Sequence, residues 1–186
     1  RVAGLWSGYF TGQQQQYLNF YQYLVIARNS DELWQRIYAT TLKNTRLMKQ
    51  KANAVNNIRL VGVAQVIEAN LMGTAADLFG DIPFSQAANE KYLNPAYDPQ
   101  KQVFAAVQSL LDSAIINLSS TAFVDFTAQD IHFASNMTKW KQTAYTLKAR
   151  NFLHTKQYPE ALAAAANGIN AVVNNFLAPH AATATG

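Results

Sequence analysis

Apolar residues recur at spacings of three and four along most of the chain, which is the period of an amphipathic helix. The first such run begins after Ser30, with Asp31 and Glu32 in its first turn, where the helix dipole favours acids. Its apolar stripe consists of Trp34, Ile37, Tyr38, Thr41, Thr45 and Met48. A second helix is predicted over residues 55–79. Because it is apolar almost all round, we expect it to be central.

Three further helices are predicted, separated by irregular loops over 80–98 and 119–136. The third begins with Asp98 as N-cap and Pro99 at its first position, and it ends near residue 118. The fourth covers 137–154, and a short connection leads to a fifth that opens at Tyr158 and Pro159. The expected inward side chains on the second to fifth helices are Leu60, Ala64, Ile67, Leu71, Ala75 and Leu78; Val103, Val107, Leu110 and Ala114; Trp140, Ala144 and Leu147; and Leu162, Ala165, Ile169 and Val172. No segment shows convincing strand alternation, so the predicted class is all-α.

The end of the second helix reads A-D-L-F-G-D-I-P-F over 76–84. Leu78 and Phe79 are expected to continue its buried face. Gly80 is the residue type that ends helices, and the proline at 83 forces the chain into an extended conformation. Asp77 and Asp81 could form an acid/base pair or a calcium site, but hydrogen bonding to the local turn is the expected role.

Composition excludes several kinds of site. The 186 residues are 49% hydrophobic and 14% charged, and the sequence contains no cysteine, which rules out disulfides, thiolate zinc sites and cysteine nucleophiles. The formal net charge of +4 is mild. The densest basic stretch is predicted to be a solvated helix face and not a nucleic-acid or lipid surface, and it comprises Lys43, Arg46, Lys49, Lys51 and Arg59. No apolar run reaches the ~18–20 residues of a membrane helix.

The motifs of common enzymes are not found either. No two acids suggest a glycosidase pair, the three histidines lack metal-ligand spacing, and neither a nucleophile elbow nor a phosphate-binding loop is present. Arg150, on an apolar helix, is expected to pair with an acid inside the scaffold. We therefore predict no catalytic residues, no metal ligands and no cofactor.

The segment 6–23 is rich in aromatic and amide side chains, a combination that suits sugars. Aromatic rings stack on the apolar faces of sugar rings, and amides donate and accept hydrogen bonds without needing a counter-ion. The predicted ligand-binding residues are Trp6, Tyr9, Gln14, Tyr17, Tyr21 and, in the first loop, Tyr92. Two alternatives stay open: the N-terminal aromatics could pack as core, and the loop around Tyr92 could contact a partner protein or be a simple connector.

The last two predicted helices form a hairpin. The second of them begins Y-P-E-A-L over 158–162 and continues in alanines, which resembles the B helix of a tetratricopeptide repeat. Small residues there let two helices approach closely. A generic helical hairpin is the alternative, and the pattern alone does not separate the two.

Four motifs occur in one order along the chain. They are Trp34-x3-Tyr38; A-D-L-F-G-D-I-P-F at 76–84; Tyr97-Asp98-Pro99-Gln100, opening the helix that contains L-D-S-A at 111–114; and Lys139-Trp140 ahead of T-L-K-A-R-N-F-L-H at 146–154 and Y-P-E-A-L at 158–162. This order resembles the SusD/RagB family of Bacteroidetes surface lipoproteins, in particular its SusD-like branch. The resemblance extends from about residue 33 to 173.

The resemblance implies a tetratricopeptide-like scaffold at the outer membrane, exposed on the cell surface. It also implies a nutrient-uptake role without catalysis, in which the protein captures a glycan or other oligomeric nutrient and passes it to a SusC-like TonB-dependent transporter. In the family, part of the ligand-contacting loop precedes the Trp34-type helix. An interaction module for peptides or proteins and a helical glycan-processing enzyme are the alternatives.

The lipidated N-terminal cysteine and the C-terminal half of that family have no counterpart here. We therefore expect an N-terminal fragment of a longer protein, with its lipid anchor outside this chain. The fragment is predicted to be one all-α domain over 1–186, with long irregular loops and a tetratricopeptide-like core over 28–175.

Overall fold

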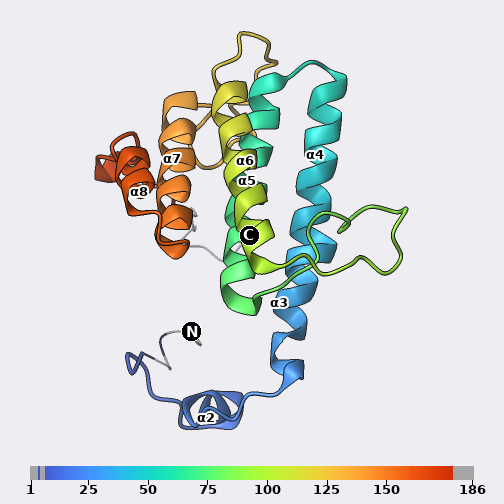
Figure 1. Cartoon of the computed structure of the whole chain (residues 1–186), viewed down its shortest axis with the longest axis vertical. Coiled ribbons are helices and arrows are strands. Elements are labelled where there is room, and N and C mark those ends of the chain that lie inside the picture. Colours follow the sequence, from blue (N-terminus) through green and yellow to red (C-terminus); the bar gives the residue numbers. More distant parts are fainter. Residues whose placement is uncertain (1–3, 5–6, 178–186) are drawn as a thin grey trace. The chain divides into compact units, whose positions relative to one another are not determined.

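The computed structural model describes residue 4 and residues 7–177 (Figure 1). Within that part of the chain it contains helices and no strand beyond an isolated bridge between Ile82 and Asp98, which confirms the all-α prediction. The chain forms two compact units, Arg1–Ile37 and Tyr38–Gly186. The prediction of a single domain over 1–186 stays a prediction.

The first unit contains short helices. They are α2 (Gln15–Tyr21), the 3-10 helix η1 (Ala27–Ser30) and α3 (Asp31–Gln35), which begins at the residue that the acidic first turn predicts. After α3 the backbone widens into the π-helix η2 (Arg36–Leu42), a feature that the apolar spacing does not reveal.

The second unit is a helical bundle around α5. Its helices are α4 (Lys43–Ala54), α5 (Ile58–Phe79), α6 (Gln100–Leu118), α7 (Met137–His154) and α8 (Tyr158–Ala165), followed by the 3-10 helix η3 (Val172–Asn174). Helix α5 packs against α4, α6 and α7, and α8 packs on α7 (Figure 1). The predicted central position of α5 is confirmed. Its fully or almost fully buried residues include Ala64, Val66, Ala69, Met72, Ala75 and Ala76.

Side-chain caps set the starts of two long helices. Asn57 accepts a hydrogen bond from the Leu60 amide, and Asn136 accepts one from the Lys139 amide. The cap at Asn57 explains why α5 begins at Ile58, three residues after the predicted start. At the other end of α5, Gly80 adopts a φ of +76°, a conformation that favours glycine, so its predicted role in ending the helix is confirmed.

Two predictions of buried faces are wrong. Leu78 is 59% exposed, and the last turn of α5 buries Ala75 and Ala76 instead. Helix α8 has only eight residues, and Leu162, Ala165 and Val172 are exposed. Ala161 and Ala164 form its buried face, since small side chains allow close approach to α7.

The aspartates of the 76–84 turn bind distant partners. Asp81 Oδ1 accepts a hydrogen bond from the backbone N–H of Gln100, the first residue of α6, at 2.8 Å. Asp77 Oδ1 lies 2.7 Å from His154 Nδ1, at the last residue of α7. The expectation of bonds to the local turn is therefore wrong for these contacts. The two carboxylates instead fasten the end of α5 to the ends of two other helices.

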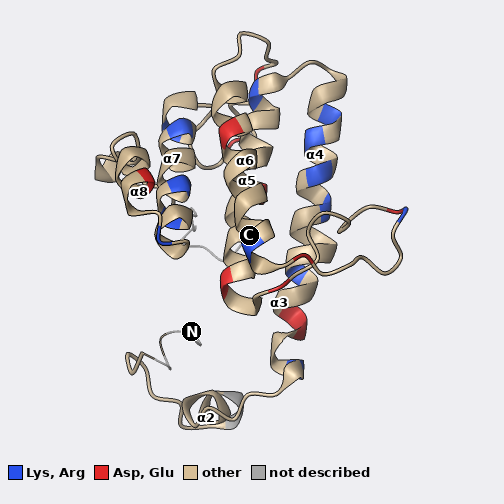
Figure 2. Cartoon of the chain, in the orientation of Figure 1, with Lys and Arg blue, Asp and Glu red and all other residues tan. Residues whose placement is uncertain are grey.

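A buried carboxylate joins α4 to α5. Glu68 is 2% exposed, and its two oxygens lie 2.9 Å from Arg46 Nε and 3.0 Å from Lys49 Nζ. Basic residues follow α4 along its length (Figure 2), yet the predicted solvated face is wrong for these two. It is also wrong for Arg59, which donates to the Ser120 carbonyl and lies over the Phe123 ring.

Arg46 also holds the loop over residues 80–99. Its Nη2 donates to the Phe84 carbonyl at 2.9 Å, its Nη1 donates to the Ala87 carbonyl, and its guanidinium lies 5.5 Å from the centre of the Phe84 ring. One guanidinium thus connects the buried carboxylate to the start of the loop. Arg150, by contrast, donates to Asn70 and Thr74 across the α5–α7 interface, so the predicted acid partner is wrong.

Asp98 closes the same loop. Its carboxylate accepts hydrogen bonds from the amides of Phe84 (2.9 Å) and Ser85 (2.8 Å) and from the Ser85 hydroxyl. Asp98 precedes Pro99, which is the N-cap, so it is not the predicted N-cap itself. Burial acts to raise the pKa of Asp98, but the hydrogen bonds from Ser85 and Phe84 outweigh it and hold the pKa below its usual value.

A second carboxylate organises the loop over 119–136. Asp130 accepts hydrogen bonds from Trp140 Nε1 at 2.7 Å and from the amides of His132, Phe133 and Ser135. Burial acts to raise the pKa of Asp130, yet these hydrogen bonds lower it overall. The buried Trp140 is therefore a core residue whose indole N–H also holds the loop through Asp130.

We expect Glu68→Ala to lower the free energy of unfolding by about 3 kcal/mol, near the lower end of the range for broken buried ion pairs. The two cations that lose their partner are themselves partly exposed, which limits the loss. Glu32→Ala is the matched control, because Glu32 pairs with Arg36 on the surface and should cost under about 1 kcal/mol. Urea unfolding measures both; equal losses would contradict the account.

We expect Asp98→Asn to lower the urea midpoint at neutral pH. The asparagine side chain has an NH2 group, which donates, in place of one of the two carboxylate oxygens that accept hydrogen bonds from Phe84 and Ser85. The carboxyl has a depressed pKa in the folded state, so its stabilisation is present above the unfolded value of about 3.9 and is lost as the pH falls through the folded value. The difference between variant and wild type should therefore shrink in acid. A difference that stays constant between neutral and acidic pH would contradict this origin.

Candidate ligand-binding surface

The predicted N-terminal ligand residues lie mostly on exposed positions. Tyr9 is 84% exposed and makes an edge-to-face contact with Phe10, their ring centres 5.8 Å apart. Gln14 is exposed and is the N-cap of α2, although its side chain makes no capping hydrogen bond. Trp6 lies outside the described residues. The alternative of a packed aromatic core is therefore not what the structure shows for Tyr9.

Gln14, Tyr17 and Tyr21 follow one another at spacings of three and four across the start and length of α2. Tyr17 and Tyr21 lie four residues apart within the helix and therefore on one side of it, while Gln14 has an extended backbone and precedes the first turn. Tyr17 is half-buried and Tyr21 is 46% exposed. The geometry of α2 thus brings two of the six predicted residues onto one side of the helix, directly after Gln14.

The N-terminal segment contains no charged side chain over a long stretch. From residue 2 to residue 27 the sequence contains no Asp, Glu, Lys, Arg or His. The exposed aromatic rings of this segment also include Phe10 and Tyr23, which the prediction did not name as site residues although the sequence pattern contained them. Tyr23 has a φ of +58°, a left-handed backbone that is uncommon for a bulky residue. A bulky residue keeps a left-handed backbone only where the surrounding structure holds it in place.

Tyr92 belongs to the second unit, whereas the N-terminal candidate residues belong to the first. It is 45% exposed and follows the turn closed by the Asn89 carbonyl and the Tyr92 amide. Its neighbours Leu93 and Tyr97 are also exposed. Arg46 and Asp98 fasten the loop on both sides of this exposed tip.

The loop base is electrostatically coupled to the bundle. Burial raises the pKa of the Tyr38 hydroxyl, and the nearby Tyr97 and Asp98 raise it further. The Tyr38 hydroxyl thus lies close to Tyr97 and Asp98 of the loop. The exposed tip around Tyr92 therefore extends from a part of the loop that is bound to the helical bundle.

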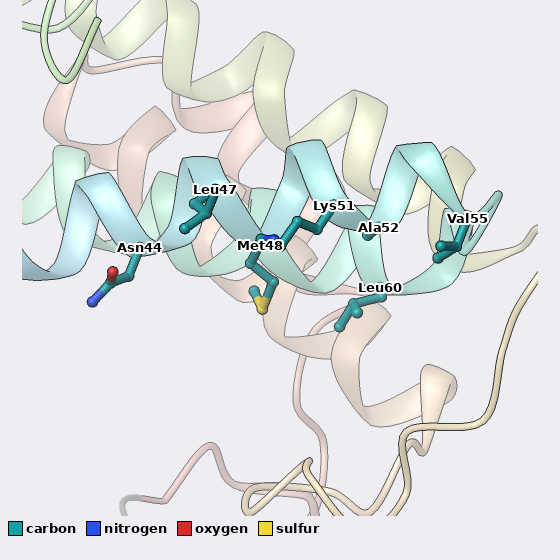
Figure 3. Close-up of a pocket in the computed structure, with 7 residues that line it drawn as sticks. All are labelled: Asn44, Leu47, Met48, Lys51, Ala52, Val55 and Leu60. Carbon is teal, nitrogen blue, oxygen red and sulfur yellow. The ribbon is translucent and has the colours of Figure 1, made fainter. Parts of the chain in front are cut away.

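One hollow in the second unit is a less favourable candidate. It has a volume of about 470 Å³ and lies over α4 and the start of α5 (Figure 3). Its lining is apolar except for Asn44 and Lys51. Ligand sites combine an apolar lining with several converging polar groups, and this hollow lacks them.

The described residues contain neither a candidate metal-ion site nor a candidate membrane-spanning helix. No group of three or more His, Asp or Glu side chains in this part of the chain is placed to hold a metal ion. Among the helices of residues 4 and 7–177, none combines the length and apolar character needed to cross a bilayer.

Solved structures share this fold. A SusD/RagB family protein from Bacteroides thetaiotaomicron matches with a TM-score of 0.85 and 27% identity, over 93% of this chain and 39% of its own. A SusD homolog from Bacteroides uniformis matches with a TM-score of 0.62 and 26% identity, over 75% of this chain and 29% of its own. A chitin-binding SusD homolog from Flavobacterium johnsoniae matches with a TM-score of 0.60 and 20% identity, over 87% of this chain and 33% of its own. At this identity the match is evidence for a shared fold only.

The chain spans 39% of the length of the first of these proteins, so it corresponds to part of such a molecule. A search of curated protein sequences found no match. A sequence profile described as "Starch-binding associating with outer membrane" matches residues 2–180. The resemblance drawn from the four motifs is thereby confirmed: the chain belongs to the SusD-like family.

Proposed function

We propose that the protein containing this chain captures a glycan at the bacterial outer membrane and passes it to a transporter. The single observation that carries the proposal is the exposed, charge-free aromatic and amide segment within a member of a family described as starch-binding. Within that segment the ligand contacts are Tyr9, Gln14, Tyr17 and Tyr21, with Trp6 as a further residue from the sequence.

The mechanism is recognition by several weak contacts. A tyrosine ring covers the apolar face of a sugar ring, and its hydroxyl or a neighbouring amide bonds to a sugar hydroxyl. Tyr17 and Tyr21, on one side of α2, suit an extended chain of sugars, since consecutive contacts lie along the helix axis. Tyr92, on its fastened loop, adds a contact in the second unit.

The description of the family as starch-binding and the chitin-binding title of one structural neighbour support a polysaccharide ligand. Starch and chitin are both uncharged, as is the segment. The protein acts by binding and does not hydrolyse the ligand.

The family's description as associating with the outer membrane supports the proposed location. A lipid anchor outside this chain holds the protein on the cell surface, and a SusC-like TonB-dependent transporter lies beneath it. In this arrangement the weak contacts allow release, because a ligand held by many exposed rings can leave them one at a time.

Replacing Tyr9 and Tyr21 by alanine in the full-length protein should weaken glycan binding by about 2- to 10-fold per ring, the loss expected for an aromatic contact of ~0.5–1.5 kcal/mol. The thermal midpoint should stay unchanged, because Tyr9 is largely exposed and Tyr21 about half. Calorimetry against starch- and chitin-derived oligosaccharides measures the affinity.

Tyr158→Ala is the matched control for both tyrosines. Tyr158 is an exposed tyrosine on α8, far along the chain from the proposed contacts, and its loss should leave affinity unchanged. Unchanged affinity in the Tyr9 and Tyr21 variants, or a drop as large in the control, would move the ligand contacts away from this segment.

The full-length protein, tagged and extracted from its native outer membrane, should co-purify with a TonB-dependent transporter. Binding to such a partner is required for a transfer step. Purification of the protein without any transporter, while it still binds glycan, would contradict the transfer and leave a surface binding protein. Binding of peptides in place of glycans would favour the interaction-module alternative.

A further inference from the structure

A second hollow lies in the helical unit, between the start of α6 and the end of α7. Its volume is about 520 Å³, within the range of small-molecule sites. The residues that line it include Gln100, Phe104, Ala105, His154 and Gln157. The hollow shares no lining residue with the ligand contacts proposed above.

The amides of this hollow have unused acceptors. Gln100 Nε2 donates to the Ala76 carbonyl at 2.7 Å, and Gln157 Nε2 donates to Thr155 Oγ1 at 2.7 Å. These bonds fix how each amide is turned. Among the described residues nothing donates to the Oε1 atom of either side chain, so both oxygens stay available to a hydroxyl donor.

His154 offers a complementary group. Its Nδ1 donates to Asp77 Oδ1 at 2.7 Å, and its ring packs edge-to-face on Phe104 with ring centres 6.0 Å apart. This leaves Nε2 without a hydrogen-bond partner in the described part of the chain. A hydroxyl matches Nε2 in either protonation state, since it both donates and accepts.

Charge around the hollow favours a neutral ligand. Lys101 also lines it and supplies a donor. However, Asp77 is bound to His154 and Asp81 to the backbone N–H of Gln100, so two carboxylates lie beside the lining. Of the first amides of α6, which would attract an anion, that of Gln100 is already bound to Asp81.

We infer that this hollow binds one neutral, hydroxyl-rich unit such as a single sugar residue. The amide oxygens of Gln100 and Gln157 accept from its hydroxyls, Lys101 donates to them, and Phe104 and Ala105 contact its apolar face. The A-D-L-F-G-D-I-P-F turn then has a role in binding, because its two aspartates position His154 and the start of α6.

Nuclear magnetic resonance of the full-length protein with isotope-labelled histidine tests this site. The His154 ring signal, identified by its loss in His154→Gln, should move on addition of glucose or N-acetylglucosamine and stay in place with glucuronate or phosphate. Ala105→Phe fills the hollow and should abolish the response. Gln102→Leu is the control, because Gln102 is an exposed amide on the same helix that does not line the hollow.

A His154 signal that ignores both neutral sugars, that responds equally to glucuronate, or that still responds in Ala105→Phe would overturn the inference. The test separates this site from the proposed function. A response that persists when Tyr9 and Tyr21 are replaced, in a protein that binds no oligosaccharide, would support the inference and overturn the proposed function. Oligosaccharide binding without a His154 response would support the proposed function and overturn the inference.

Discussion

The second unit depends on one buried negative charge. Glu68 lies in the middle of the central helix, almost without contact with water, and a carboxylate in such a place is tolerated only when cations and hydrogen bonds compensate it. Arg46 and Lys49 provide that compensation from α4. The requirement fixes α4 against α5 in one register, because only one rotation of α4 brings both cations to the two oxygens.

The same constraint extends to the surface. After binding Glu68, Arg46 still has N–H groups that donate to two carbonyls near the start of the loop over 80–99. Asp98, at the end of the same loop, accepts hydrogen bonds from the amides of Phe84 and Ser85 near its start. A buried ion pair therefore determines where an exposed loop with Tyr92 begins. The interior thus holds the start of this loop through backbone carbonyls, contacts that do not depend on the side chains of the loop residues involved.

Periodicity predicted the helices well where packing is uniform. Helix α7 has the predicted bounds, and α5 is central as its apolar surface indicates. Predictions failed where partners distant in sequence decide the outcome: Leu78 and Leu162 are exposed because no helix covers them, and Asp81 serves α6. Glu68 was overlooked, although an acid in the middle of a largely apolar 22-residue helix, with Arg46 and Lys49 three residues apart on the preceding helix, was a usable signal.

The candidate ligand residues were found by side-chain chemistry and not by periodicity, and their exposure in the first unit agrees with that origin. Spacing along α2 explains how Tyr17 and Tyr21 share one side, but no local rule relates them to Tyr92 in the other unit. The central claim is that a charge-free aromatic surface binds a neutral glycan. Calorimetry of the full-length protein against starch- and chitin-derived oligosaccharides at low and high salt tests it most directly. The account predicts binding whose affinity does not change with salt, since no ion pairs form; no binding, or binding that salt weakens strongly, would contradict it.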